Sequence, residues 1–211
     1  SSLTRFFARA AGSSGSAAAD EEAAAVGVCY NGGLHIRTVE ARQLEERGGT
    51  SRRVLPLPET VFEWGGRHGL DGQGLLYFLA TAGRTGPWAS FADIEGGGLV
   101  RVSGCRWQRG RAYDAACSSP HIRVDSWSEG VHSAWFSIEL PEGLFIEASH
   151  YTLRHGSSGG AQLRSWQLLV SEDGISYDLA RSHAADPSLV GAYCTRTWEL
   201  PPVLRAARFF K

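Results

Sequence analysis

One string in the sequence has the residue types needed for nucleophilic catalysis. Gly156, Ser158 and Gly160 match the G-x-S-x-G pattern, in which a serine is exposed on a sharp turn between a strand and a helix. Residues 163–170, which follow this string, alternate like a strand instead of showing a helical period. We therefore predict a hairpin loop at this point and no catalytic residue.

A thiol nucleophile or a bound metal needs cysteine and histidine at close, defined spacing. Cys117 and His121 lie near each other, with His132 further on, but the residues between them are typical of an irregular loop. Asp71 begins a loop without the alternating oxygen ligands of a calcium site. No C-x-x-C pair joins the four cysteines, which are Cys29, Cys105, Cys117 and Cys194. We predict reduced thiols in an intracellular protein, with no metal and no cofactor.

Exposed aromatic and arginine side chains are the strongest candidates for binding. They fall in turn-rich stretches, above all between Ser103 and Ser133, and Trp, Tyr and Arg supply most of the energy at protein interfaces. The alternative for Trp88 and Trp127 is that they plug the end of the core. The candidate partner-binding residues are Arg84, Trp88, Trp107, Arg109, Arg111, His121, Arg123 and Trp127.

Composition limits the class of protein that could use these residues. The 211-residue chain has 21 basic and 22 acidic side chains and a formal net charge of −1, which argues against a dedicated nucleic-acid binder. No apolar run is long enough to span a bilayer. The 26 glycines and the many aromatic residues favour strands joined by tight turns.

Three segments follow from the distribution of residues. Residues 1–23 form a flexible or helical arm whose acid-free start resembles an organellar transit segment, and residues 24–58 form a hairpin and a short helix starting at Thr38. Residues 59–211 form the main domain. The chain contains no Met, so we expect either a removed N-terminus or a piece of a longer product.

The sequence of the main domain predicts a series of short strands without amphipathic helices between them. This pattern predicts an all-β, antiparallel jelly-roll or sandwich. Residues 75–79 are apolar on both faces and are expected to form a buried strand, whereas 135–140 alternate cleanly. The other expected strands are 99–102, 151–155, 166–170, 197–200 and 207–210.

A series of motifs follows these strands in a fixed order. Residues 151–155 read Y-T-L-R-H, 163–168 read L-R-S-W-Q-L and 171–174 read S-E-D-G, followed by His183 and Asp186. The series resembles the discoidin-like β-sandwich domains, relatives of the coagulation-factor type C and galactose-binding folds. It is most similar to the version found in certain HECT-type ubiquitin ligases and BTB-domain proteins, over residues 60–211.

The resemblance implies that binding occurs through loops at the end of the sandwich. It also implies that Arg154, His155, His183 and Asp186 are scaffold positions, the last two in a hydrogen-bonded turn. The family normally has a further strand after Phe210, so we expect residues 24–37 or a neighbouring protein to cover that sheet edge.

These observations predict a non-catalytic module that binds a partner protein or docks into a larger assembly. Two alternatives remain: a structural subunit of a large organellar or cytoskeletal complex, and a carbohydrate-binding module. We expect a cytoplasmic or organellar location.

Overall fold

The computed structural model describes residues 29–30, 37–43, 66, 69–70, 72–91, 100–116, 119–123, 125–128, 134–157, 162–201 and 205–211. The predicted arm at 1–23 lies outside these residues, as do Asp71, Cys117, His132 and Ser158. The predicted segment boundaries at 23 and 58 also lie outside them and stay predictions.

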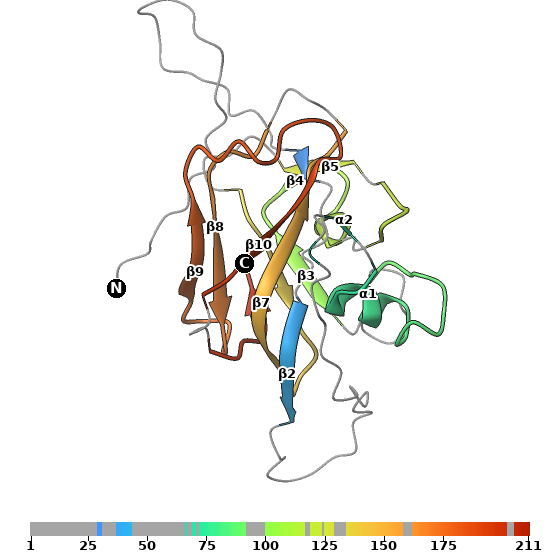
Figure 1. The fold of residues 1–211 in the computed structure, drawn as a ribbon, viewed down its shortest axis with the longest axis vertical. Helices are drawn as coiled ribbons and strands as arrows, with labels where there is room; N and C mark the ends of the chain where they lie inside the picture. Colours follow the sequence, from blue (N-terminus) through green and yellow to red (C-terminus); the bar gives the residue numbers. More distant parts are fainter. Residues whose placement is uncertain are drawn as a thin grey trace, which may run out of the picture.

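The described residues form antiparallel strands grouped in three sheets, as predicted for an all-β fold (Figure 1). The five-stranded sheet has the order β3 (Arg101–Gly104), β6 (Phe136–Glu139), β11 (Phe209–Phe210), β8 (Trp166–Ser171) and β9 (Asp178–His183). A three-stranded sheet contains β10 (Thr195–Glu199), β7 (Leu144–Arg154) and β2 (Arg37–Gln43). A smaller one contains β1 (Cys29–Tyr30), β5 (Ser126–Ser128) and β4 (Trp107–Arg109).

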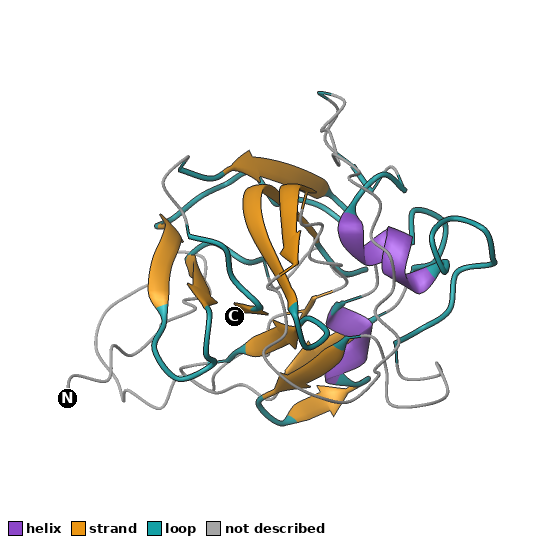
Figure 2. Cartoon of the chain, turned by 90° about the horizontal axis from the view of Figure 1, so that it is seen from below, coloured by secondary structure: helices purple, strands orange, loops and turns teal. Residues whose placement is uncertain are grey.

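The strand predicted at 75–79 is wrong, because Leu75–Ala80 forms helix α1. Its buried residues are Leu75, Leu76, Leu79 and Ala80, which lie on one side of a helix at 3.6 residues per turn. A short apolar run satisfies a helical and an extended pattern equally well, so periodicity alone could not separate them. The second helix, α2, is one turn long (Ala112–Ala115), and Figure 2 shows both helices to one side of the strands.

The N-terminal hairpin and helix are also corrected. β1 and β2 lie in different sheets and therefore do not pair as a hairpin. Arg37–Gln43, where we expected a helix from Thr38, is a strand that pairs with β7. Pairing with a long neighbouring strand supplies backbone hydrogen bonds that outweigh a weak local helix preference. The N-terminal segment thus adds β1 to the small sheet and β2 to the sheet of β7 and β10. We expected residues 24–37 to cover a sheet edge, but the longer of these strands, β2, begins only at Arg37.

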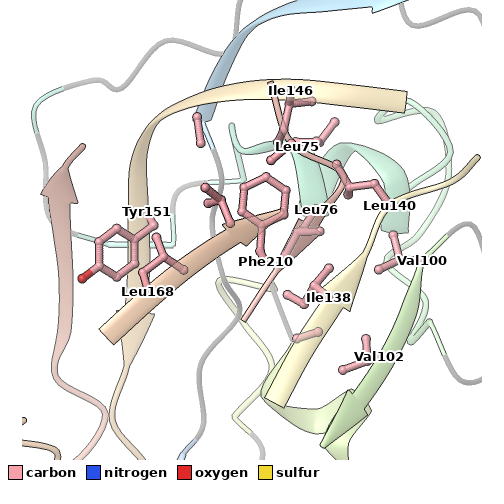
Figure 3. Packing of buried hydrophobic residues seen from close by; sticks show 14 of the residues in the cluster. Leu75, Leu76, Val100, Val102, Ile138, Leu140, Ile146, Tyr151, Leu168 and Phe210 are labelled. Atoms are coloured by element: carbon pink, nitrogen blue, oxygen red, sulfur yellow. The ribbon is translucent and has the colours of Figure 1, made fainter. Parts of the chain in front are cut away.

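The core lies between the five-stranded sheet and β7. Ile138 and Leu140 are buried as their alternation predicted, and Ile146 of β7 is buried with them. Figure 3 shows the ring of Phe210 in the middle of this cluster, with Tyr151 at its edge. The Tyr151 hydroxyl points away from the aliphatic side chains and lies within hydrogen-bonding distance of the His183 ring.

Candidate functional site

A buried arginine fixes the loop that contains residues 119–123. Arg154, at the end of β7, is 6% exposed. Its guanidinium donates hydrogen bonds to the carbonyl oxygens of Ser119 (3.2 Å) and Ile122 (2.6 Å). The Ser119 hydroxyl oxygen accepts from the N–H groups of His121 and Ile122. Charge-assisted bonds from a buried donor hold a loop more firmly than neutral ones, so this loop is presented by the sheet in a defined conformation.

The outer side of this loop combines an apolar residue with an arginine–aromatic contact. Ile122 is 39% exposed, and the exposed Arg123 lies over the ring of Tyr193 at 4.7 Å. Tyr193 comes from a second loop, and its N–H bonds to Gly156 just beyond β7 (3.0 Å). That second loop also carries Val190, which is 48% exposed. We call Ile122, Arg123, Val190 and Tyr193 the anchored loop surface.

A second arginine–aromatic pair lies on the small sheet. Arg109 of β4 is directly opposite Trp127 of β5, and its guanidinium lies 4.9 Å from the centre of the indole. The indole N–H of Trp127 donates to the Gln108 side chain (3.2 Å). Arg111 follows, exposed, and its backbone N–H donates to the Asp114 carboxylate (2.7 Å). Figure 1 places β4 and β5 at the upper end of the molecule.

The structure distributes the predicted binding residues over several places. It brings Arg109 to Trp127, and it places His121 and Arg123 together on the anchored loop. Trp107 is half-buried, and its indole N–H has no hydrogen-bond partner among the described residues.

The two remaining candidates follow α1. Arg84 donates to the carbonyl oxygen of Gln73 and lies over the Phe78 ring. Trp88 is partly buried and packs against the core, which agrees with the plugging alternative for this residue. The contacts of Arg84 with Gln73 and Phe78 place it beside α1.

Sequence reasoning missed three members of the surface and one support. Ile122 was not a candidate, because only aromatic, arginine and histidine side chains were chosen. Val190 and Tyr193 were not candidates, because no spacing rule relates a loop at 188–194 to one at 119–123. Arg154 was expected to be scaffold, but not to hold the binding loop. The available signal was an arginine on a strand among apolar residues, since a buried charge requires polar partners from elsewhere in the chain.

A polar network joins the two larger sheets. The Tyr151 hydroxyl lies 2.6 Å from Nε2 of His183, and Nδ1 of His183 lies 2.6 Å from the Asp186 carboxylate. The indole N–H of Trp166 donates to the Tyr151 oxygen (3.1 Å), and its ring stacks on His183 at 3.9 Å. Trp198 stacks on Tyr151. The predicted hydrogen bond between His183 and Asp186 is confirmed.

The network is satisfied by a neutral histidine. Nδ1–H donates to Asp186 and Nε2 accepts from Tyr151, whose oxygen accepts from Trp166; a protonated ring would leave the tyrosine proton without its acceptor. Burial lowers the pKa of His183, although its hydrogen bond to Asp186 acts in the opposite direction. Burial raises the pKa of Asp186, but hydrogen bonds from Ser188 and His183 hold it below its ordinary range. Burial raises the pKa of Tyr151.

Acid is expected to weaken the fold through His183. Because the pKa of His183 in the folded chain lies below the ordinary histidine value of 6.5, the unfolded chain binds the proton more tightly. The free energy of unfolding should therefore fall as the pH decreases from about 7.5 to about 5.5. Urea unfolding across this range measures the slope. His183→Gln should remove much of it, whereas His121→Gln, at an exposed site, should leave it unchanged. Equal slopes in all three proteins would contradict the assignment.

The described residues contain no group of three His, Cys, Asp or Glu side chains placed to hold a metal ion. Neither of the helices in them has the length and hydropathy to span a bilayer. Ser158 is outside them, but the first regular element after the G-x-S-x-G string is strand β8 and not the helix of a nucleophile elbow.

The chain is similar to the E3 ubiquitin-protein ligase Ufd4 of Drosophila melanogaster, with 32% identity over 134 residues. That stretch is 62% of this chain and 5% of the ligase. The likeness is to one short region. The chain therefore spans about a twentieth of the length of the curated relative that it matches. No protein-family model matches the chain, and no solved structure matches it.

Proposed function

We propose that this chain is a non-catalytic, discoidin-like β-sandwich that binds a partner protein through the anchored loop surface. The observation that carries the proposal is the bonding of buried Arg154 to the Ser119 and Ile122 carbonyls. A binding loop held by a rigid sheet loses little conformational entropy when a partner docks.

The composition of the surface supports a protein partner. Arginine and tyrosine are enriched among the residues that dominate binding energy, and they act best beside apolar contacts that exclude water. Arg123 on Tyr193, next to exposed Ile122, has this composition. In Ufd4, the similar region is a small part of a ligase, which fits a docking role within a larger assembly.

The proposal of no catalytic activity has two supports. The Tyr151, His183 and Asp186 groups resemble a proton relay, but Trp166 stacks on His183 and neither His183 nor Tyr151 is exposed. The serine string is followed by a strand. We also propose an intracellular location, because Cys105 and Cys194 are free thiols in a fold that needs no disulfide.

Site-specific crosslinking tests the proposed surface. The photoreactive residue p-benzoylphenylalanine replaces Ile122 in the full chain, and the same residue replaces Ile175 as a control, which is 85% exposed on the turn between β8 and β9. We expect the Ile122 position to capture one defined protein that the Ile175 position does not.

Affinity measurements with that purified protein decide the proposal. Arg123→Ala and Tyr193→Ala should each weaken binding by about tenfold or more, the effect of losing an interface residue worth at least ~1.4 kcal/mol. Ile175→Ala should leave the affinity unchanged. Capture by both positions, or equal affinities for all variants, would refute this surface as the binding site.

A further inference from the structure

The segment that contains the second arginine–aromatic pair is locally basic. Residues 100–128 hold five arginines and two aspartates, in a chain with a formal net charge of −1. Both carboxylates are already engaged, Asp114 by the N–H of Arg111 and Asp125 by the N–H of Ser157. The ion pairs found among the described residues join Arg101 and Arg208 to Glu139 and His183 to Asp186, and do not include Arg109 or Arg111.

Arg109 is held in a conformation suited to a carboxylate. Its guanidinium lies over the Trp127 ring, and this cation–π contact restrains the group while Arg109 stays exposed to solvent. A planar, pre-oriented guanidinium binds a carboxylate by two parallel hydrogen bonds. The cross-strand register of Arg109 with Trp127, together with the bond from the Trp127 indole to Gln108, keeps the pair in place.

The same geometry disfavours a nucleic acid as the ligand. Single-stranded nucleic acids bind by stacking bases on free aromatic faces along a continuous basic groove. Here one face of Trp127 is covered by Arg109, and the indole is only partly exposed. A nucleic-acid footprint also needs many cations, whereas two arginines suit a short acidic segment of a protein.

We propose that Arg109 and Arg111 form a carboxylate-binding strip that takes an acidic peptide segment of the partner protein. This rests on the proposed function, since it names the chemistry of the partner. Arg109, restrained by its contact with Trp127, receives one carboxylate in a bidentate pair, and Arg111, two residues further along the chain, receives a second. The resulting binding weakens as salt concentration rises.

Fluorescence anisotropy of labelled oligomers tests this strip with the full chain. The probes are oligoglutamate, oligolysine and oligouridylate of equal length. We expect oligoglutamate to bind most tightly. Arg109→Ala combined with Arg111→Ala should raise its Kd by about tenfold or more, and Arg109→Lys should recover only part of the affinity because lysine lacks the planar fork.

The control is Arg101→Ala, which removes the same charge from an arginine on β3 whose side chain is 76% exposed. It should change the Kd little. An equal loss in Arg101→Ala, full recovery by Arg109→Lys, or tighter binding of oligouridylate would each overturn the strip. Thermal unfolding of every variant verifies that the fold is retained. Crosslinking from Ile122 does not depend on Arg109 or Arg111. If the oligomer experiment refutes the strip, the anchored loop surface is still tested by the crosslinking experiment.

Discussion

Alanine in place of Phe210 is expected to lower the free energy of unfolding by about 3–5 kcal/mol, the usual cost of removing a buried phenylalanine. Phe210 is 1% exposed and pairs with Ile138 on one side and Val170 on the other. Its ring lies in the middle of the core (Figure 3). Truncation therefore opens a cavity at the centre of the five-stranded sheet, where no neighbouring side chain can fill it without moving a strand.

Urea unfolding followed by tryptophan fluorescence measures this loss, and Phe209→Ala is the matched control. Phe209 has the same side chain on the same strand but is only partly buried, so its replacement should cost clearly less. Comparable losses in the two variants would show that the core is not centred on Phe210.

Arg154→Met is expected to lower the free energy of unfolding by about 2–4 kcal/mol, because each charge-assisted hydrogen bond contributes roughly 1.5–3 kcal/mol. Methionine keeps the length and apolar bulk of the side chain but cannot donate to the Ser119 and Ile122 carbonyls. The loss should therefore come from the hydrogen bonds and not from a cavity.

Hydrogen exchange distinguishes loop release from general destabilisation. The His121 and Ile122 N–H groups, which bond to the Ser119 hydroxyl, should exchange faster in Arg154→Met under conditions where the core strands stay protected. Arg101→Met removes an exposed arginine whose ion pair with Glu139 is screened by water, so it should change the stability little and leave this exchange unchanged. If the loop amides keep their protection in Arg154→Met, the buried arginine does not hold the loop.

Strands whose alternation is uninterrupted could be predicted from the sequence. Residues 135–140 and 166–170 alternate, and the structure has β6 at Phe136–Glu139 and β8 at Trp166–Ser171. The strand predicted at 197–200 overlaps β10 at Thr195–Glu199. Leu144, Ile146 and Ala148 alternate in the same way, yet the prediction starts that strand only at Tyr151. The structure joins both parts in the single strand β7.

Elements fixed by distant contacts could not be predicted in this way. Residues 75–80 are short and wholly apolar, so helix and strand patterns fit equally, and packing of one helical face against the core decides between them. Arg37–Gln43 becomes a strand only because β7 pairs with it. The sequence pattern of a short segment cannot indicate that it will pair with a strand more than a hundred residues away.

At the candidate site, too, the sequence indicated which residue types could bind but not which residues lie beside them. Choosing arginines and tryptophans between Ser103 and Ser133 found Arg109, Arg123 and Trp127. The aromatic partner of Arg123, however, is Tyr193, and the support of its loop is Arg154. These relations depend on which loops meet at the end of β7, which is a property of the topology.

The position of β11 between β6 and β8 has a consequence for synthesis of the protein. β6 and β8 are neighbours only through β11 in the order of the sheet, and β11 follows β6 by about seventy residues. We therefore expect the sheet to remain as two unjoined halves with exposed edges until β11 has been translated, a state prone to aggregation. Closure is then expected only after Phe210 has left the exit tunnel.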